Sequence, residues 1–105
     1  MSPYEIYIIN MAWGSGGKTR PVLAFIIDKN TADIYQITTQ YESKSEEIKA
    51  LYFKIIDWAQ AGLDKQSYVD TGTLITLPTN AFKGKSPIGS LTDADKHRLL
   101  EFLCS

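Results

Sequence analysis

The chain has 105 residues, of which 44% are hydrophobic and 22% are charged, and its formal net charge is −1. This length suits one small domain and is too short for two, and the composition is typical of a soluble globular protein. A near-neutral charge argues against a dedicated duplex-DNA binder, whose affinity depends on many phosphate contacts. We therefore expect a single domain over residues 1–105, with any nucleic-acid contact confined to a small area.

The sequence predicts a cytoplasmic protein without a membrane segment. No apolar run approaches the roughly 18 residues that a membrane span needs. The first residues lack the basic region and long apolar stretch of a secretory signal. The one cysteine, Cys104, cannot form an internal disulfide, which fits a reducing compartment.

The first third of the chain predicts three strands. Residues 4–13 are rich in Tyr and Ile and end before a glycine, which favours a strand. Pro21 then opens the continuous apolar run 22–27, typical of a strand covered on both faces. Residues 28–31 contain turn formers, and the alternating residues 32–39 predict a third strand in a hairpin.

The middle of the chain leaves two alternatives open. The polar residues 42–49 predict a solvated loop with room for one helical turn. Residues 52–58 favour a strand because many of them are β-branched or aromatic. The alternative is a single helix over residues 46–61. Residues 59–62 allow one helical turn, which Gly62 would end.

The next segments predict short strands separated by a bend and a loop. Residues 68–70 and 73–77 read as two strands with a bend at Gly72. Residues 79–87 predict a loop, and residues 88–91 predict either a last strand or the lead-in to the final segment.

The C-terminal segment predicts an amphipathic helix. Thr92 is a suitable N-cap, and Asp93 and Asp95 suit the first turn, where the helix dipole favours negative charge. An apolar stripe follows at Leu99, Leu100 and Leu103. Many short strands with one late helix indicate a mainly β fold, either a compact barrel or a small sandwich.

Two common site classes do not fit the sequence. His97 is the only histidine and no Cys-x-x-Cys is present, so we expect no metal site. A catalytic triad would need His97, which is more simply a solvated residue on the polar side of the last helix.

The glycine-rich stretch 14–21 resembles a phosphate-binding loop only superficially. Its Gly-Lys-Thr ending matches the Walker pattern, but Ala12 replaces the first glycine. A phosphate-binding loop must lead into a helix, whereas Pro21 opens a strand. We therefore reject a nucleotide triphosphatase.

Several residues near this stretch suit phosphate or base binding. The Arg20 guanidinium offers a fork of donors matched to phosphate and could stabilise charge on a scissile phosphate. The Thr38 hydroxyl could contact a phosphate oxygen, and Asp70 could accept a proton. Trp13 and Tyr35 could stack a base. Each residue taken singly also has an ordinary structural explanation.

Together these segments resemble the MazF/PemK-like toxins of type II toxin–antitoxin systems. The resemblance spans nearly the whole chain, and Gly-x-x-Arg-Pro-Val-Leu after a short first strand is its most specific part. The matching segments are residues 5–9, 14–23, 36–38, 61–63, 67–69 and 88–91.

The resemblance implies a PemK/CcdB-type barrel, related to SH3-like barrels, that acts as a homodimer. It implies an endoribonuclease, an mRNA interferase, that cuts single-stranded RNA at short sequences without metal or other cofactor. In that mechanism the ribose 2′-OH attacks the adjacent phosphate and leaves a cyclic phosphate and a 5′-OH. A partner antitoxin covers the RNA groove.

The resemblance also implies roles for individual residues. Arg20 matches the catalytic arginine of Arg-Pro-Val, and Thr38 matches the catalytic threonine of Ile-Thr. Asp70 is the acid nearest to the position where other members carry one. The RNA-binding residues that it implies are Trp13, Ser15, Gly16, Gly17, Lys18, Thr19 and Thr39.

One departure from the family leaves the general acid and base open. Many members carry Glu or His in the glycine loop, where this chain has Ser15 and Gly16. Either Arg20 acts as both stabiliser and proton donor, or Asp70 substitutes. An inactive domain is one alternative. The missing loop acid also motivates a second alternative, a non-catalytic gyrase-poison-like toxin on the same barrel. Such a toxin would bind a protein target through the C-terminal helix, with Trp13 and Arg20 dispensable.

Overall fold

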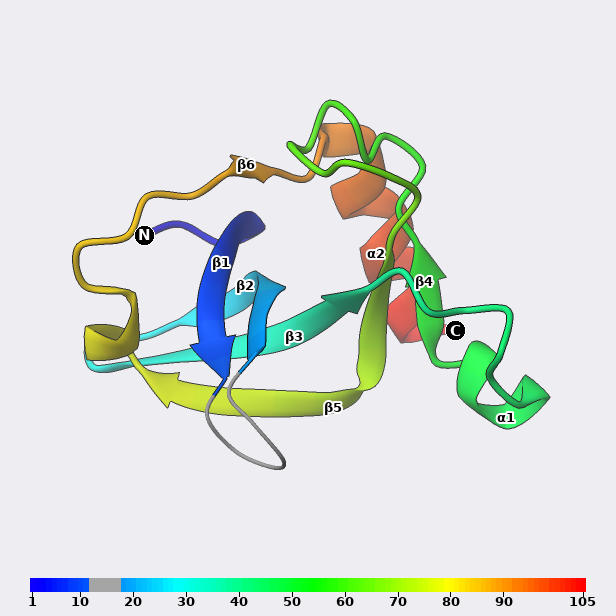
Figure 1. Cartoon of the computed structure of the whole chain (residues 1–105), viewed down its shortest axis with the longest axis horizontal. Coiled ribbons are helices and arrows are strands. Elements are labelled where there is room, and N and C mark those ends of the chain that lie inside the picture. The colour runs from blue at the N-terminus through cyan, green and yellow to red at the C-terminus, as the bar shows by residue number, and fades with distance from the viewer. Residues whose placement is uncertain (12–17) are drawn as a thin grey trace.

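In a computed structural model, residues 1–11 and 18–105 are described. The fold is mainly β, with a sheet that curls into a half-barrel and a C-terminal helix beside it (Figure 1), which confirms the coarse fold class. The elements are β1 (Glu5–Met11), β2 (Lys18–Ile27), β3 (Thr31–Thr38), α1 (Glu46–Lys49), β4 (Tyr52–Lys54), β5 (Tyr68–Pro78), the 3-10 helix η1 (Thr79–Phe82), β6 (Gly89–Ser90) and α2 (Asp93–Cys104).

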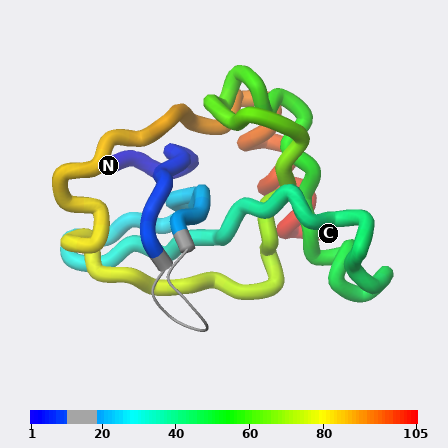
Figure 2. The backbone as a smooth tube through the Cα atoms, in the orientation of Figure 1, coloured from blue at the N-terminus to red at the C-terminus, as the bar shows by residue number. Residues whose placement is uncertain are grey.

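All six strands form one antiparallel sheet in the order β4-β5-β3-β2-β1-β6. The first three strands pair in sequence order, which confirms the predicted hairpin of the second and third, and β5 adds outside β3. Along β3 the β5 partner changes from Ile75, opposite Ile34, to Asp70, opposite Gln36. Residues 71–74 therefore bulge out of the ladder, and such a bulge bends a sheet. Figure 2 shows this bend in the backbone path.

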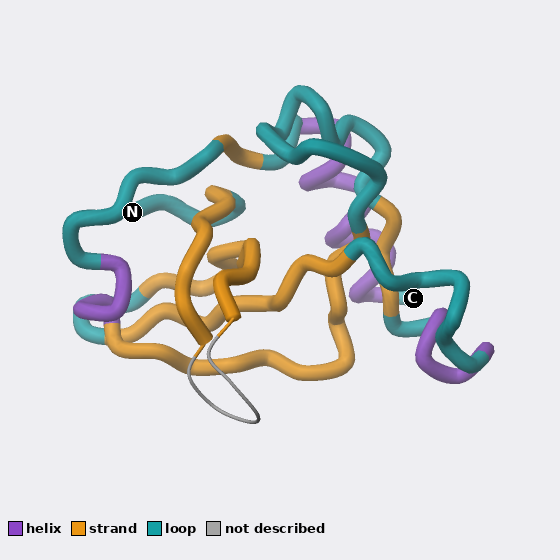
Figure 3. Tube along the Cα trace, viewed as in Figure 1, coloured by secondary structure: helices purple, strands orange, loops and turns teal. Residues whose placement is uncertain are grey.

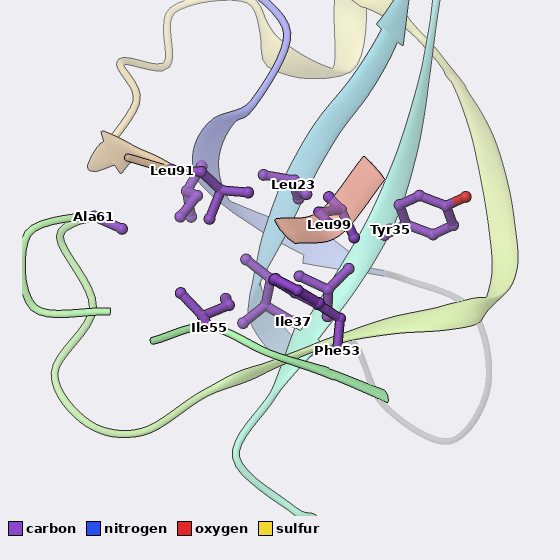
Figure 4. Close-up of a cluster of buried hydrophobic side chains, with 10 residues drawn as sticks. Leu23, Tyr35, Ile37, Phe53, Ile55, Ala61, Leu91 and Leu99 are labelled. Atoms are coloured by element: carbon purple, nitrogen blue, oxygen red, sulfur yellow. The ribbon is translucent and has the colours of Figure 1, made fainter. Parts of the chain in front are cut away.

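The sheet has two apolar faces because side chains alternate along each strand. We name them after adjacent residues of β2. The Leu23 face packs against α2, where Leu99 lies among strand side chains (Figure 4). The Val22 face holds a smaller cluster that includes Phe82 of η1, whose ring lies 5.2 Å from that of Tyr7. Helix η1 contacts both β1 and β5 and so covers one end of this face.

Strand β2 begins at Lys18, three residues before Pro21, so the prediction that proline opens the strand was wrong. Pro21 pairs with Ile8 of β1, whereas pairing with β3 begins only at Val22. At Pro21 the sheet is therefore bonded on one side only, where a missing N–H is tolerated.

The region between β3 and β5 contains only one turn of helix, so the alternative of one helix over residues 46–61 was wrong (Figure 3). Helix α1 is the predicted helical turn, with Ser45 as its N-cap. β4 is a strand, as predicted, but it ends at Lys54, short of the predicted 52–58. The Ile55 amide still bonds to the Ser67 carbonyl oxygen, and the pairing ends after it because the amides of Ile56 and Asp57 bond to a carboxylate on α2.

Three shorter predictions need adjustment. Residues 59–62 form turns without a helix, so the predicted helical turn with Gly62 as its stop was wrong. Gly62 has a φ of +94°, a conformation that suits a glycine in a turn. The two strands predicted on either side of Gly72 form one strand, β5. The last strand, predicted over residues 88–91, is the shorter β6, Gly89–Ser90. A Cβ on Gly89 would lie 2.0 Å from the Ala61 carbonyl oxygen, so only glycine fits this crossing.

Helix α2 confirms the predicted N-cap but differs on its buried face. The Thr92 hydroxyl accepts a hydrogen bond from the amide of Asp95 at 3.2 Å. Leu99 is fully buried, whereas Leu100 is 43% exposed, so including Leu100 in the apolar stripe was wrong. The buried side includes Asp95, which is also fully buried, because its carboxylate serves the loop after β4.

Tyr7 gives the fold a measurable pH dependence. Burial and the hydrogen bond that its hydroxyl donates to Glu5 raise the pKa of Tyr7 from 10.0 to about 12. Because the folded-state pKa is raised, the associated stability is complete below pH 10 and is lost as the pH rises towards 12.

We expect the free energy of unfolding of the wild type to fall by about 2–3 kcal/mol over that window through this residue. Tyr7→Phe should lose less of its stability there, since phenylalanine does not titrate. Urea denaturation on either side of the window measures the difference. Equal losses in both proteins would show that Tyr7 ionisation is not coupled to folding.

Within the described ranges, no helix combines the length and apolar character that crossing a bilayer requires.

Candidate functional site

A pocket of about 440 Å³ opens where β2 begins and β3 ends. It brings Arg20 and Thr38 together, the two residues matched to catalytic positions of the toxin family. The lining residues are Thr19, Arg20, Pro21, Ile37, Thr38, Thr39, Gln40 and Ser67.

The strand register explains why these two side chains meet. Val22 of β2 lies opposite Gln36 of β3. Arg20 is two residues before Val22, and Thr38 is two residues after Gln36, so all four side chains share the Val22 face. Arg20 also lies opposite Ile9 of β1, which belongs to the apolar cluster on that face. The pocket is therefore the polar end of a largely apolar surface.

The Thr38 hydroxyl is oriented by its own strand end. Its oxygen accepts a hydrogen bond from the Gln40 amide at 3.0 Å. A hydroxyl that accepts one bond still has its hydrogen to donate. Thr38 can therefore donate to an anionic oxygen in the pocket.

The Arg20 side chain is exposed, and no hydrogen bond or ion pair joins it to another of the described residues. A guanidinium has five donors and stays charged at all relevant pH values. Arg20 and Thr38 together thus offer one cation and one hydroxyl donor to a phosphate-like group.

Asp70 does not line this pocket. It lines a second pocket of about 450 Å³ together with Thr73 and Ile75, beside the bulge of β5. Its carboxylate accepts a hydrogen bond from the Gly72 amide at 2.9 Å. Asp70 lies opposite Gln36, so it shares the Val22 face with Thr38 but belongs to a neighbouring cavity.

The remaining predicted RNA-binding residues divide into two groups. Thr19 and Thr39 line the Arg20 pocket, and Lys18 begins β2, where its backbone pairs with Met11. The others lie outside the described residues: Trp13, Ser15, Gly16 and Gly17.

Two polar residues of the pocket were not predicted. Gln40 follows Thr39 directly, so the Thr-Thr-Gln run at the strand end was the available signal. Ser67 is almost fully buried, and its hydroxyl donates to the Lys65 carbonyl oxygen at 2.8 Å. Its position depends on the pairing of β5 with β3, which no local pattern reveals.

Among residues 1–11 and 18–105, no three His, Cys, Asp or Glu side chains gather closely enough to hold a metal ion. His97 lies on the exposed side of α2, where its Nε2 is 3.4 Å from a Glu101 carboxylate oxygen. The described residues that line the Arg20 pocket offer anion binding and hydrogen-bond donation. A comparison with protein-family models and with curated proteins found no match to this chain.

Proposed function

We propose that this chain is the toxin of a type II toxin–antitoxin system and cleaves single-stranded RNA in the Arg20 pocket. The observation that carries the proposal is the juxtaposition of Arg20 and Thr38 in one solvent-open pocket. These residues lie 18 positions apart, and the sequence resemblance had assigned both to catalysis. We further propose that the half-barrel is a variant of the PemK/CcdB-type, SH3-like barrel.

In the proposed reaction, the 2′-oxygen of the RNA attacks the adjacent phosphorus and the bond from phosphorus to the 5′-oxygen breaks. The products are a 2′,3′-cyclic phosphate and a 5′-OH. Arg20 binds the phosphate and stabilises the charge that builds on its oxygens. Thr38 donates its hydroxyl hydrogen to one of those oxygens.

The proton transfers involve the two residues that the sequence left as alternatives. Arg20 lines the pocket and donates a hydrogen bond to the leaving 5′-oxygen, whereas Asp70 lines the neighbouring pocket. Because a guanidinium stays protonated, the proton that the 5′-oxygen takes up comes from water. The 2′-OH proton passes to Asp70 in a substrate that reaches both pockets along the shared Val22 face, and to water in a substrate that does not. We propose no metal or other cofactor in either step.

The same proposal includes its partners and location. A homodimer would present two Arg20 pockets, and a cognate antitoxin would cover them in the cytoplasm. The neighbouring gene is a simple test of this proposal. If a small reading frame beside the gene for this chain encodes a DNA-binding protein with an acidic tail, the proposal is supported.

The direct test is an RNA cleavage assay with the purified protein. A panel of single-stranded RNAs of varied sequence is incubated in EDTA, and the ends of the products are identified. We expect cleavage at short sequences, leaving 5′-OH ends. An RNA panel that stays intact at high protein concentration would contradict the proposal.

Thr38→Val should lower the cleavage rate by about 10- to 100-fold, since it removes one hydrogen bond to a charged oxygen. Single-turnover rates on one cleaved RNA measure the loss. Thr31→Val is the matched control, because Thr31 is exposed at the opposite end of the same strand. Equal rates for both variants would show that the Thr38 hydroxyl is not part of the chemistry.

The gyrase-poison-like alternative requires a protein contact through α2. Truncating residues 99–105 cannot test it, because Leu99 is fully buried and the Phe102 ring lies 5.6 Å from that of Phe53. Leu100→Asp is a cleaner probe, since Leu100 is exposed. Growth arrest that needs Leu100 but survives Arg20→Ala would favour this alternative.

A further inference from the structure

Three tyrosines form a cluster next to the Arg20 pocket, and we call them the tyrosine cluster: Tyr41, Tyr52 and Tyr68. The rings of Tyr41 and Tyr68 stack with centroids 4.3 Å apart and an interplanar angle of 8°. The Tyr52 ring lies 6.4 Å from that of Tyr41. All three side chains are only half-buried, so part of each ring faces solvent.

The register places this cluster on the same face of the sheet as Arg20. Tyr68 of β5 is the direct partner of Thr38, and Thr38 shares the Val22 face with Arg20. Since neighbouring strands lie about 4.8 Å apart, Tyr68 lies about 10 Å across the sheet from Arg20. That separation suits neighbouring nucleotides of one extended strand.

The chain itself connects the pocket to the cluster. Thr39 and Gln40 line the Arg20 pocket, and Tyr41 is the next residue. A strand of RNA that leaves Thr38 along this segment therefore meets the Tyr41 ring first.

The charges around the cluster favour a base more than a second phosphate. Lys49 lies 5.1 Å from the centre of the Tyr41 ring, but Glu42 and Glu46 each approach its ammonium at 3.9 Å. Lys54 is exposed opposite Tyr68 and forms no ion pair with the residues that the structure describes. Aromatic rings with one available cation match the stacking sites of proteins that bind single-stranded nucleic acid.

We propose that the tyrosine cluster is a nucleobase-stacking subsite for the nucleotide next to the one whose phosphate binds Arg20. The ligand class is single-stranded RNA, so the inference rests on the proposed function. Because every base has a π-face, the subsite contributes affinity without selecting one base. It therefore lowers KM more than it raises kcat.

The test is a binding experiment with short single-stranded RNA in which every ribose carries a 2′-O-methyl group, which blocks cleavage. Removing one base at a time should identify a position where the wild type loses about tenfold in affinity. Tyr41→Leu should bind the intact RNA about tenfold more weakly and lose nothing further at that position. Tyr41→Phe keeps the ring and should bind like the wild type.

A second measurement uses the unaltered protein and so does not depend on whether a variant folds. RNA with 5-iodouridine at the identified position is cross-linked by light, and the attached peptide is identified by mass spectrometry. We expect attachment at Tyr41, Tyr52 or Tyr68.

Two results would overturn the inference. The first is that, at every abasic position, the wild type and Tyr41→Leu lose the same affinity. The second is that cross-links form only at residues outside the tyrosine cluster. RNA that binds as described but is never cleaved when its 2′-hydroxyls are free would contradict the proposed function and leave the stacking subsite standing. No binding of single-stranded RNA would overturn both.

Discussion

Arg20→Ala is expected to lower the rate of RNA cleavage by about 100- to 1000-fold and to abolish growth arrest. This is the usual cost of removing one group that stabilises developing charge in a transition state. Among the described residues that line the pocket, Arg20 is the only charged one, so none of the others can replace its charge.

The fold should survive this substitution. The Arg20 side chain is exposed and has no hydrogen bond or ion pair with other described residues, so its removal leaves no buried partner unsatisfied. Surface changes of this kind alter stability by about 0.5 kcal/mol or less. A thermal melt of Arg20→Ala should therefore resemble that of the wild type.

Two controls sharpen this prediction. Arg20→Lys keeps the charge but loses the planar fork, so we expect intermediate activity. Lys83→Ala removes an exposed cation beyond η1 and should leave cleavage unchanged. If Arg20→Ala cleaved RNA as fast as Lys83→Ala, the role of Arg20 in catalysis would be refuted.

Asp95→Ala is expected to destabilise the fold by about 3 kcal/mol or more. Asp95 is fully buried, and its carboxylate accepts hydrogen bonds from the amides of Ile56 at 3.2 Å and Asp57 at 2.8 Å. It also accepts from the Arg98 guanidinium at 3.0 Å. Removing one partner of a buried ion pair leaves the others unsatisfied, which typically costs 3–5 kcal/mol.

The remaining contacts limit this loss but do not replace the carboxylate. Asp57 also bonds to Arg98, at 3.3 Å, and to the Thr92 hydroxyl, at 2.8 Å. The guanidinium therefore keeps one carboxylate partner in Asp95→Ala. The two backbone amides after β4 keep none of the bonds that Asp95 supplied.

Asp93→Ala is the matched control for this prediction. Asp93 lies in the same first turn of α2, but it is exposed, and among the described residues it pairs only with Lys96, at 3.4 Å. Such an exposed pair contributes about 1 kcal/mol or less. Urea denaturation compares the two variants. Equal, small losses in both would show that the Asp95 contacts do not hold the loop to the helix.

The sequence correctly predicted the strands and the helix whose residues carry a clear local pattern. The first three strands follow from runs of β-forming residues, and Thr92 with two early aspartates marks the start of α2. The bounds that were predicted wrongly belong to segments whose structure depends on partners distant in the sequence. β4 is short because the loop after it bonds to Asp95, which lies 39 positions from Ile56.

The candidate site shows the same division. Arg20 and Thr38 were predicted from their motifs, and their shared pocket follows from the pairing of β2 with β3 in a hairpin. The tyrosine cluster was not predicted. Its members come from three separate segments, and only the register of β5 against β3 and β4 brings Tyr68 and Tyr52 together.

The most direct measurement of the central claim compares two RNAs that differ at one atom. An RNA that the protein cleaves is made again with a single 2′-deoxyribose on the 5′ side of the cleaved bond, and both are incubated with the protein in EDTA. If the 2′-oxygen attacks a phosphate held by Arg20, the all-ribose RNA should be cut and the substituted one should stay intact. Equal cutting of both RNAs would contradict the account.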